Sequence, residues 1–345
     1  MYVSADEIKA QAVAQGFNLV GITRAVPSPT LAAYERWLEA GMNADMGYMA
    51  REDRLARRRN LNVILPNVQS LIVVGFDYAQ YIPKSLLEDP SRGRIAAYAW
   101  GIDYHDLMLP KLKALGKWLR TRLQHDYAAY VDTGAILERS HAQQAGLGFI
   151  GKNTMLINSR RGSQFFIGEI LTTAYIESDS PHRETMCGVC TRCLNACPTD
   201  AFPQPHVLDA RRCISYHTIE NKGSIPIELR ANFGNWIYGC DVCQDVCPFQ
   251  RFATPTQEIN FTQTDIERIA PRLSDLLALD KEQFAQRFAG SAIARIKHER
   301  LLRNACVAAG NSGDRALLPL LEKLLAHENS IVQEHAAWGM GRLSV

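Results

Sequence analysis

Hydrophobic positions at the start of the chain switch between helical and extended spacing, which is typical of α/β domains. Ser4 and Glu7 form a capping-box pattern at the start of an amphipathic stretch over 4–15, which predicts a helix there. A short apolar segment over 17–23 then predicts a strand, and 31–40 predicts a second helix. We therefore expect the chain to open with helix, strand and helix.

The next apolar segments extend this pattern. Residues 70–76 read S-L-I-V-V-G-F, an unbroken apolar run that indicates a strand buried on both faces. Asp103 is a suitable N-cap for a helix that ends near Leu123, with leucines at helical spacing between them. Pro110 lies after the first turn of that helix and is expected to delay its start. Residues 127–131 predict another strand.

The following segments complete a first domain. Residues 138–145 predict a short helix, and 154–158 and 163–176 predict two strands. The sequence S-R-R-G at 159–162 separates these strands and favours a hairpin turn. We therefore predict that residues 1–178 form an α/β domain with a mixed sheet.

The C-terminal part contains a repeat. Residues 304–310, N-A-C-V-A-A-G, align with 335–341, H-A-A-W-G-M-G, at a spacing of 31 residues, and a leucine-rich helix lies between them. Small residues on one helix and leucines on its partner suit the close stacking of a HEAT-type helical pair. We therefore predict a helical, HEAT-like domain over 251–345. Cys306 occupies a small-residue position of this repeat, where a buried core thiol is the favoured interpretation.

Composition limits the protein class. The chain has 345 residues, 47% of them hydrophobic and 21% charged, which indicates a globular protein of more than one domain. A net charge of +2 means that any nucleic-acid contact depends on local basic patches. The N-terminus lacks the basic and then apolar pattern of a signal peptide, and no apolar stretch is long enough to cross a membrane. We therefore expect a cytoplasmic protein without a membrane contact.

The cysteines carry the most specific pattern in the chain. Residues 187–198 read C-G-V-C-T-R-C-L-N-A-C-P, with four cysteines at spacings of two, two and three intervening residues. Bacterial ferredoxins use this run to hold [4Fe–4S] clusters, and the cysteine before the proline ligates the other cluster of a pair. A second run over 240–248 has the same ending but lacks one cysteine, which Cys213 can supply.

Two clusters need eight thiolates, and the chain has nine cysteines. Zinc sites and disulfides are the alternatives. Paired C-x2-C motifs for zinc do not explain this triplet with its trailing Cys-Pro, and disulfides are unexpected without export. We therefore predict a ferredoxin-like two-cluster domain over 179–250 within an α+β multidomain chain. The exchange rule assigns one cluster to Cys187, Cys190, Cys193 and Cys247, and the other to Cys213, Cys240, Cys243 and Cys197.

Few residues of the first domain stand out as catalytic candidates. Asp132 ends a predicted strand and can donate a proton at neutral pH if burial raises its pKa. The alternative is that Asp132 only makes the turn in D-T-G. Lys152 and Asn153 follow a glycine-rich stretch and are either ligand contacts or ordinary loop residues. The arginine-rich stretch over 51–59 is either an anion-binding segment or a solvated helix face.

A basic segment precedes the helical repeat. Its cationic residues face a single acidic residue in the stretch, Glu299, and a local basic face suits a phosphate backbone. Surface helices also carry such charges without a partner. The predicted nucleic-acid contacts are Arg287, Arg295, Lys297, His298, Arg300 and Arg303.

Taken together, these motifs resemble the epoxyqueuosine reductases, cobalamin-dependent iron–sulfur enzymes of tRNA queuosine synthesis. The resemblance rests on V-D-T-G-A-I-L-E-R (131–139), A-G-L-G-F-I-G-K-N (145–153) and the cysteine run over 187–198. It also rests on D-A-R-R-C-I-S-Y (209–216) and G-N-W-I-Y-G-C-D-V-C-Q-D-V-C-P (234–248). These motifs span almost the whole chain in the family's order.

The resemblance implies a specific reaction. It implies that the chain reduces epoxyqueuosine to queuosine at the wobble position of tRNA, with Asp132 as the proton donor. It also implies that Arg58, Lys152, Asn153 and Ser215 line a cobalamin that accepts electrons from the two clusters. The expected partners are a tRNA and a low-potential electron donor, and we expect a monomer.

Two other interpretations remain open at this point. One is a different corrinoid iron–sulfur reductase, such as a reductive dehalogenase, although those enzymes usually carry an export signal and need no helical tail. The other is an electron-transfer module without catalysis, which predicts two clusters, no corrinoid and no role for Asp132 in turnover.

Overall fold

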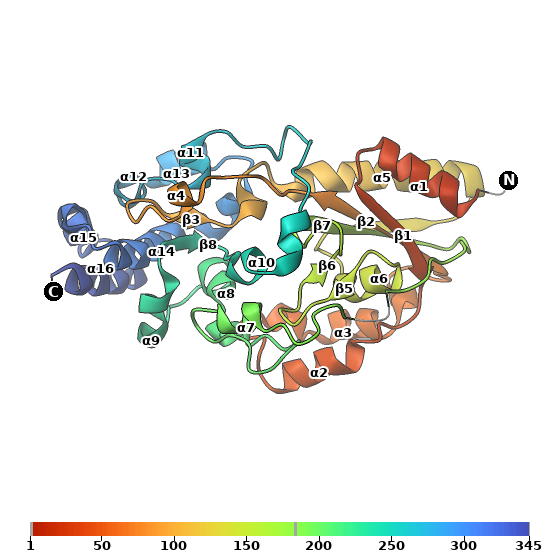
Figure 1. Cartoon of the computed structure of the whole chain (residues 1–345), viewed down its shortest axis with the longest axis horizontal. Coiled ribbons are helices and arrows are strands. Elements are labelled where there is room, and N and C mark those ends of the chain that lie inside the picture. The colour runs from red at the N-terminus through yellow and green to blue at the C-terminus, as the bar shows by residue number, and fades with distance from the viewer. Residues whose placement is uncertain (1–2, 183–184, 345) are drawn as a thin grey trace.

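The computed structural model describes residues 3–182 and 185–344. Residues 1–2, 183–184 and 345 fall within the three predicted domain ranges and lie outside this description. A sheet with helices on both faces occupies the N-terminal end of the molecule, and short helices and loops of the cysteine region lie in the middle (Figure 1). The last helices lie at the opposite end (Figure 1).

The described residues contain both strands and helices throughout. The strands are β1 (Leu19–Arg24), β2 (Ser70–Asp77), β3 (Arg94–Ile95), β4 (Tyr127–Tyr130), β5 (Phe149–Ile150), β6 (Leu156–Ile157), β7 (Phe165–Thr172) and β8 (Trp236–Tyr238). The helices are α1 (Ala5–Ala14), α2 (Leu31–Glu39), α3 (Glu52–Arg59), α4 (Lys84–Leu87), α5 (Tyr104–Leu123), α6 (Glu138–Gln144), α7 (Arg192–Asn195), α8 (Ile214–Ile219), α9 (Ile227–Arg230), α10 (Val242–Asp245), α11 (Ile266–Ile269), α12 (Leu273–Ala278), α13 (Lys281–Arg287), α14 (Lys297–Ser312), α15 (Leu318–Leu324) and α16 (Ser330–Leu343).

The main sheet has four strands in the order β1-β2-β7-β4. Each neighbouring pair in it is antiparallel, so the prediction of a mixed sheet is wrong. The predicted buried strand is β2, and every one of its residues is buried because β1 and β7 flank it and helices cover both faces. The one parallel pairing between named strands in the described part is the short β3–β8 ladder.

The two faces of the sheet bury different sets of side chains. One face packs against α1 and α5, where Met108 and Leu112 meet Ile72 and Ile170 in a single apolar cluster. The other face packs against α6, with Ala142 among its buried contacts. Figure 1 shows α1 and α5 above the sheet and α6 below it. The candidate site lies where β4 ends, with residues from the start of α5 and the start of α6.

Local signals in the sequence place the first helices correctly. Ser4 accepts a hydrogen bond from the Glu7 N–H, and the Glu7 carboxylate accepts one from the Ser4 N–H, so the capping box forms. The helix α5 begins at Tyr104, where Asp103 caps it by accepting from the His105 N–H at 3.0 Å. Pro110 lies inside α5, so the expectation that it delays the helix start is wrong. The cap and the buried side chains that follow outweigh the lost backbone hydrogen bond.

The predicted hairpin has different strand partners from those expected. Asn158 and Gly162 form an isolated bridge, so the chain does turn over S-R-R-G. However, β6 pairs with β5, whereas both edges of β7 are taken by β2 and β4. The two predicted strands therefore belong to separate sheets. The long β7 forms more backbone hydrogen bonds between β2 and β4 than it would beside the two-residue strand β6.

The C-terminal helices pack closely through their small residues. A methyl group added at Gly310 of α14 would lie 2.8 Å from the Gly339 Cα of α16, and one added at Gly339 would lie 2.8 Å from the Cys306 carbonyl oxygen. Leu321 of α15 lies on the same side of α16. Cys306 is fully buried, as predicted. The small residues of the sequence repeat are therefore the contact between these helices.

Among the helices of the described residues, none is both long and apolar enough to cross a membrane.

Candidate functional site

Eight cysteines lie in the middle of the molecule, and all eight are half-buried free thiols. The ninth, Cys306, is buried in the C-terminal helices. Burial, and after it the nearby Cys187 and Cys190 thiols, raise the pKa of Cys247. The final cysteine of the second run therefore lies beside the first cysteines of the first run.

The remaining thiols lie near one another in the second group. Burial raises the pKa of Cys240 well above its usual value, and the neighbouring Cys213 and Cys243 thiols add to this effect. Burial raises the pKa of Cys213, and the nearby thiol of Cys197, the last cysteine of the first run, raises it further. The last cysteine of each run therefore lies with the thiols of the other run. Cys193 of the first group also lies close enough to Cys243 of the second group to raise its pKa.

This arrangement suits clusters better than single ions. In residues 3–182 and 185–344, no three His, Cys, Asp or Glu side chains converge as the ligands of a single metal ion would. A four-iron cluster instead takes one thiolate at each iron, so its four ligands stand around a larger body. Eight thiols in two neighbouring groups fit that requirement.

Lys152 and Asn153 connect the sheet domain to the cysteine loops. The Lys152 Nζ donates hydrogen bonds to the carbonyl oxygens of Gly188 and Cys190, at 2.8 and 2.9 Å. The Asn153 Nδ2 donates to the Cys243 carbonyl oxygen at 3.0 Å. These residues therefore contact both cysteine groups directly.

Asp132 ends the turn after β4 in the left-handed backbone region, with φ +58°. Its side chain is exposed, so the protein alone does not bury this carboxyl. The Tyr104 hydroxyl donates to the Asp132 Oδ2 at 2.8 Å, and the Asp132 N–H donates to the Glu138 Oε1 at 2.9 Å. Burial, and after it the Asp132 carboxylate, raise the pKa of Tyr104, which keeps its phenol protonated as a donor.

Charged groups from several elements lie near Tyr104 and Asp132. Arg295 forms an ion pair with Asp103, and its guanidinium carbon lies 5.4 Å from the centre of the Tyr104 ring. Although burial opposes it, hydrogen bonds from His105 and Arg295 lower the pKa of Asp103 to about 2. Burial raises the pKa of Glu220, and the charge of the nearby Asp132 raises it further.

The arginines of α3 lie beside the Asp132 loop. The Arg54 guanidinium donates to the Thr133 carbonyl oxygen at 3.2 Å. Arg58 is buried, and its guanidinium carbon lies 4.9 Å from the centre of the Tyr34 ring. The buried Nε atoms of Arg54 and Arg58 have no hydrogen-bond acceptor in the described part of the chain. Ser215 follows Cys213 at the start of α8 and is half-buried.

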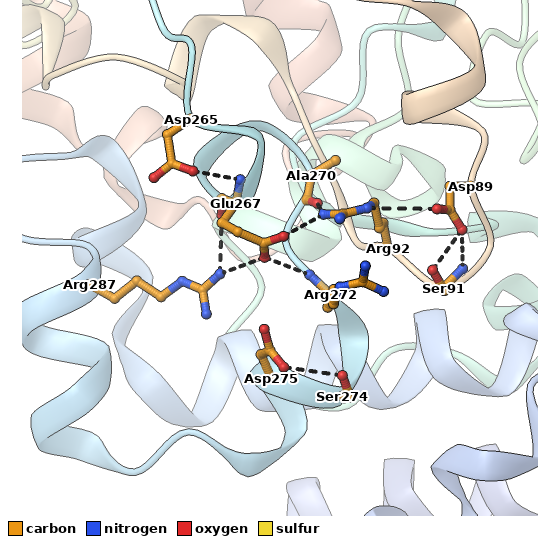
Figure 2. A network of polar contacts seen from close by, with 10 residues as sticks. All are labelled: Asp89, Ser91, Arg92, Asp265, Glu267, Ala270, Arg272, Ser274, Asp275 and Arg287. Carbon is orange, nitrogen blue, oxygen red and sulfur yellow. Dashed lines mark hydrogen bonds and ion pairs between the residues drawn. The ribbon is translucent and has the colours of Figure 1, made fainter.

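The predicted basic face is largely occupied by internal contacts. Arg287 donates to Glu267, which also pairs with Arg92 and accepts from the Arg272 N–H (Figure 2). The Arg300 guanidinium donates to the Ile219 carbonyl oxygen at 2.6 Å. These side chains stabilise the packing of the C-terminal helices.

Two members of that face are not on the surface at all. Arg303 is 1% exposed and donates to the carbonyl oxygens of His217, Asn221 and Gly223. His298 is buried and donates from Nε2 to the Leu279 carbonyl oxygen at 2.7 Å. Their prediction as nucleic-acid contacts is therefore wrong, because both side chains satisfy backbone carbonyls inside the protein. Lys297 is exposed, and Arg295 is exposed but paired with Asp103.

Sequence reasoning missed two partners of Asp132 and a buried acid in the main sheet. Tyr104 opens α5, Glu138 opens α6, and Glu169 lies in the middle of β7. The signal for Glu169 was available, since it is the one charged residue within the apolar run F-F-I-G-E-I-L. An acidic side chain in such a run indicates either an edge strand or a special role, and β7 is a central strand.

The fold and the two cysteine groups define an iron–sulfur oxidoreductase. The family described as a 4Fe-4S double cluster binding domain matches residues 186–250, and that described as epoxyqueuosine reductase QueG, DUF1730, matches residues 58–133. The chain is 45% identical over 276 residues to the epoxyqueuosine reductase of Synechocystis sp., covering 79% of this chain and 92% of the relative.

Two further comparisons extend over nearly the whole chain. The chain is 40% identical over 342 residues to the epoxyqueuosine reductase of Escherichia coli, covering 98% of this chain and 89% of the relative. A crystal structure of epoxyqueuosine reductase with a tRNA-Tyr epoxyqueuosine-modified tRNA stem loop superposes with a TM-score of 0.90 at 30% identity, covering 99% of this chain and 90% of that one. The chain belongs to the epoxyqueuosine reductase family.

Proposed function

We propose that this chain reduces epoxyqueuosine to queuosine at the wobble position of tRNA, using cobalamin and two [4Fe–4S] clusters. The relatives from Synechocystis sp. and Escherichia coli are named epoxyqueuosine reductase. One similar structure contains an epoxyqueuosine-modified tRNA stem loop. The observation that carries the proposal is the geometry at Asp132. The Tyr104 hydroxyl fixes this exposed carboxyl, and Glu138 fixes the Asp132 backbone N–H, at a strand end beside α3.

The eight grouped cysteines hold the clusters in this proposal. The exchange of the last cysteine between the runs supports one cluster on Cys187, Cys190, Cys193 and Cys247, and one on Cys197, Cys213, Cys240 and Cys243. The closeness of Cys193 and Cys243 favours electron transfer between the two clusters. Cys306 has no part in this relay because it is buried in another region.

Several side chains near Asp132 fit a corrinoid. Its ring carries amide side chains, and the buried Arg54 and Arg58 Nε–H groups lack an acceptor that such amides would supply. Ser215 would approach it from the cysteine region, while Lys152 and Asn153 would fix the boundary with the cysteine loops. When bound, cobalamin would supply a cobalt centre that passes electrons to the epoxide.

Asp132 supplies a proton in this proposal. Conversion of the epoxide to an alkene breaks two C–O bonds, consumes two electrons and two protons, and releases one water. Asp132 would protonate the departing oxygen, and the Tyr104 hydroxyl would hold the carboxyl in position. The exposure of Asp132 leaves it accessible to a nucleotide extruded from the anticodon loop.

The same proposal assigns a role to each of the three predicted domains and names the partners of the chain. Residues 1–178 would bind cobalamin, 179–250 would bind the clusters, and the HEAT-like helices of 251–345 would support the tRNA. Lys297 is the best placed member of the predicted basic segment for a phosphate, because it is exposed and carries no ion pair among the described residues. The chain would act as a cytoplasmic monomer supplied by a low-potential donor.

Reconstitution tests the proposal. The chain is purified anaerobically, loaded with iron, sulfide and cobalamin, and given a strong reductant and an epoxyqueuosine-containing tRNA. Mass spectrometry of the digested nucleosides should show queuosine, which lacks one oxygen of the substrate. Retention of epoxyqueuosine by a chain that holds both clusters and cobalamin would contradict the proposal.

A further inference from the structure

An open hollow of about 890 Å³ lies on the surface of the cysteine region. It forms where α7 and α10 pack against each other, and each of these helices lies inside one cysteine run. Of the eight grouped cysteines, all within the described residues, Cys247 alone lines this hollow. A four-iron cluster needs four thiolates around it, so the hollow is not the space for the cluster. It lies directly beside the first cysteine group.

The first cysteine group lies closer to the surface than the second. Val189, inside the first cysteine run, is 98% exposed, whereas Asp241 and Gln244, inside the second run, are buried. Ser215, which would approach the corrinoid, follows Cys213 of the second group. Electrons that enter at the first group would therefore reach the corrinoid by way of the second group.

The rim of the hollow is basic. Arg192 and Arg251 both line it, and both are exposed. Among the described residues that line the hollow, Asp245 carries the one carboxylate. This carboxylate is already paired, because the Arg94 Nη2 donates to the Asp245 Oδ2 at 2.7 Å. The two arginines therefore give the rim a net positive charge beside a cluster ligand.

The deeper part of the hollow is apolar. Ala196, Val246 and Pro248 line it and are half-buried, in contrast to the exposed arginines. An apolar floor under a basic rim fits a planar apolar group that is bordered by carboxylates. The exposed edge of a flavin in an acidic carrier protein has these properties. Charge complementarity therefore favours an acidic flavoprotein over a neutral or basic partner at this surface.

We propose that this hollow is the docking site of a small acidic flavoprotein that delivers electrons to the cluster held by Cys247. This inference rests on the proposed function, which needs a low-potential donor but does not identify it. In each encounter, an anionic flavin hydroquinone would give one electron to the oxidised cluster and become the neutral semiquinone, without transfer of a proton. Two encounters therefore supply the two electrons that reduction of one epoxide consumes.

Charge reversal tests the docking site. A chain with both Arg192→Glu and Arg251→Glu keeps all eight grouped cysteines, so its iron content should equal that of the wild type. Each protein, loaded with clusters but without tRNA, is mixed anaerobically with the hydroquinone of a purified flavodoxin, and the loss of cluster absorbance is followed by stopped flow. At low salt the charge-reversed chain should be reduced at least about tenfold more slowly than the wild type. Added salt should shrink this difference because it screens the charges.

Arg122→Glu is the matched control for the single variant Arg251→Glu. Both arginines are exposed beside an aromatic ring, with the guanidinium carbon 5.2 Å from the centre of the Trp118 ring and 4.6 Å from that of Phe252, respectively. Both substitutions change the net charge equally, but Arg122 lies in the last turn of α5, away from the cysteine runs. Arg122→Glu should accept electrons from flavodoxin at the wild-type rate. Reduced methyl viologen, a small cation, should reduce every variant at least as fast as the wild type.

Calorimetric titration with oxidised flavodoxin gives a readout that does not depend on electron transfer. Wild type and Arg122→Glu should bind with equal affinity at low salt, and the charge-reversed chain should bind at least about tenfold more weakly. If the charge-reversed chain binds flavodoxin and accepts its electrons as well as the wild type does, the docking site is disproved. Rapid reduction of the wild type by a ferredoxin but not by flavodoxin would overturn the choice of a flavoprotein. Queuosine formation with reduced methyl viologen tests the proposed function separately, because this reductant does not need the docking site.

Discussion

The Tyr104 hydroxyl donates a hydrogen bond of 2.8 Å to the Asp132 Oδ2. Tyr104 comes from the start of α5, whereas Asp132 follows β4, so the fold brings together two residues from opposite ends of one helix–strand unit. The Tyr104 ring also packs against Phe166, with ring centres 4.4 Å apart, and against the Arg295 guanidinium. Rigid packing of the phenol therefore limits the positions of the Asp132 carboxyl.

Removal of this contact should slow the reaction. Tyr104→Phe keeps the ring and its stacking on Phe166 but deletes the donor to Asp132. A hydrogen bond to a charged group is worth about 1.5–3 kcal/mol, so we expect a loss of about ten- to a hundredfold in the single-turnover rate. Cluster and cobalamin content should not change. A wild-type rate in a fully loaded Tyr104→Phe protein would show that the phenol does not position Asp132.

Arg303 should contribute to stability instead of tRNA affinity. Arg303→Met fills a similar volume but leaves the carbonyl oxygens of His217, Asn221 and Gly223 without their shared donor. We expect a loss of about 3 kcal/mol or more in the free energy of unfolding, measured by denaturant titration. The tRNA affinity of the protein that remains folded should stay within about twofold of the wild type, since this side chain is 1% exposed. Weakened tRNA binding without a loss of stability would contradict this role.

The cysteine assignment predicts two different iron contents. Cys306→Ser should retain eight irons per chain, the content of two four-iron clusters, because Cys306 is buried among the C-terminal helices. Cys247→Ser removes a thiol from the group that contains Cys187 and Cys190, so one cluster should be lost or become labile. Iron and sulfide analysis with electron paramagnetic resonance measures both results. Equal iron loss in the two variants would refute the assignment.

His335 should make the C-terminal helices sensitive to acid. It is 0% exposed, donates from Nδ1 to the Ile331 carbonyl oxygen and accepts at Nε2 from the Ile225 N–H. Burial lowers its pKa to about 4 from 6.5, so the unfolded chain binds the proton more tightly. The stability from neutral His335 is complete above pH 6.5 and falls as the pH drops toward 4, by about 1 kcal/mol at pH 5.5.

The matched variant isolates this effect from acid damage elsewhere. His335→Gln should be less stable than the wild type at pH 7.5, but the difference between the two proteins should shrink at pH 5.5. Thermal unfolding of both proteins at the two pH values measures this difference in stability. A constant difference would mean that His335 does not titrate between the folded and unfolded states.

Patterns that depend on neighbouring residues along the chain were sufficient to predict much of the fold. The capping box at Ser4, the N-cap at Asp103 and the cysteine spacings depend on neighbours along the chain, and the structure forms both caps and brings the cysteines together. Strand pairing was not predictable in the same way. The position of β7 between β2 and β4 depends on contacts far apart in sequence, so the mixed sheet and the pairing of the two hairpin strands were wrong, although the chain does turn over S-R-R-G.

The same limit applies to the site. A row of basic residues looks identical in sequence whether its side chains point to solvent or to buried carbonyls, so Arg303 could not be distinguished from Lys297. Asp132 could be singled out from its strand-end motif, but its partners Tyr104 and Glu138 could not, because only the fold places them beside it.

The central claim is that Asp132 delivers a proton in the reduction of epoxyqueuosine. The most direct measurement is a single turnover of epoxyqueuosine-containing tRNA by wild type and Asp132→Asn, both with full clusters and cobalamin. Asn preserves the size of the side chain and can accept from Tyr104, but it cannot donate an acidic proton. We predict queuosine from the wild type and a rate at least about a hundredfold lower from Asp132→Asn, with tRNA affinity unchanged. Equal rates of queuosine formation by the two proteins would contradict the claim.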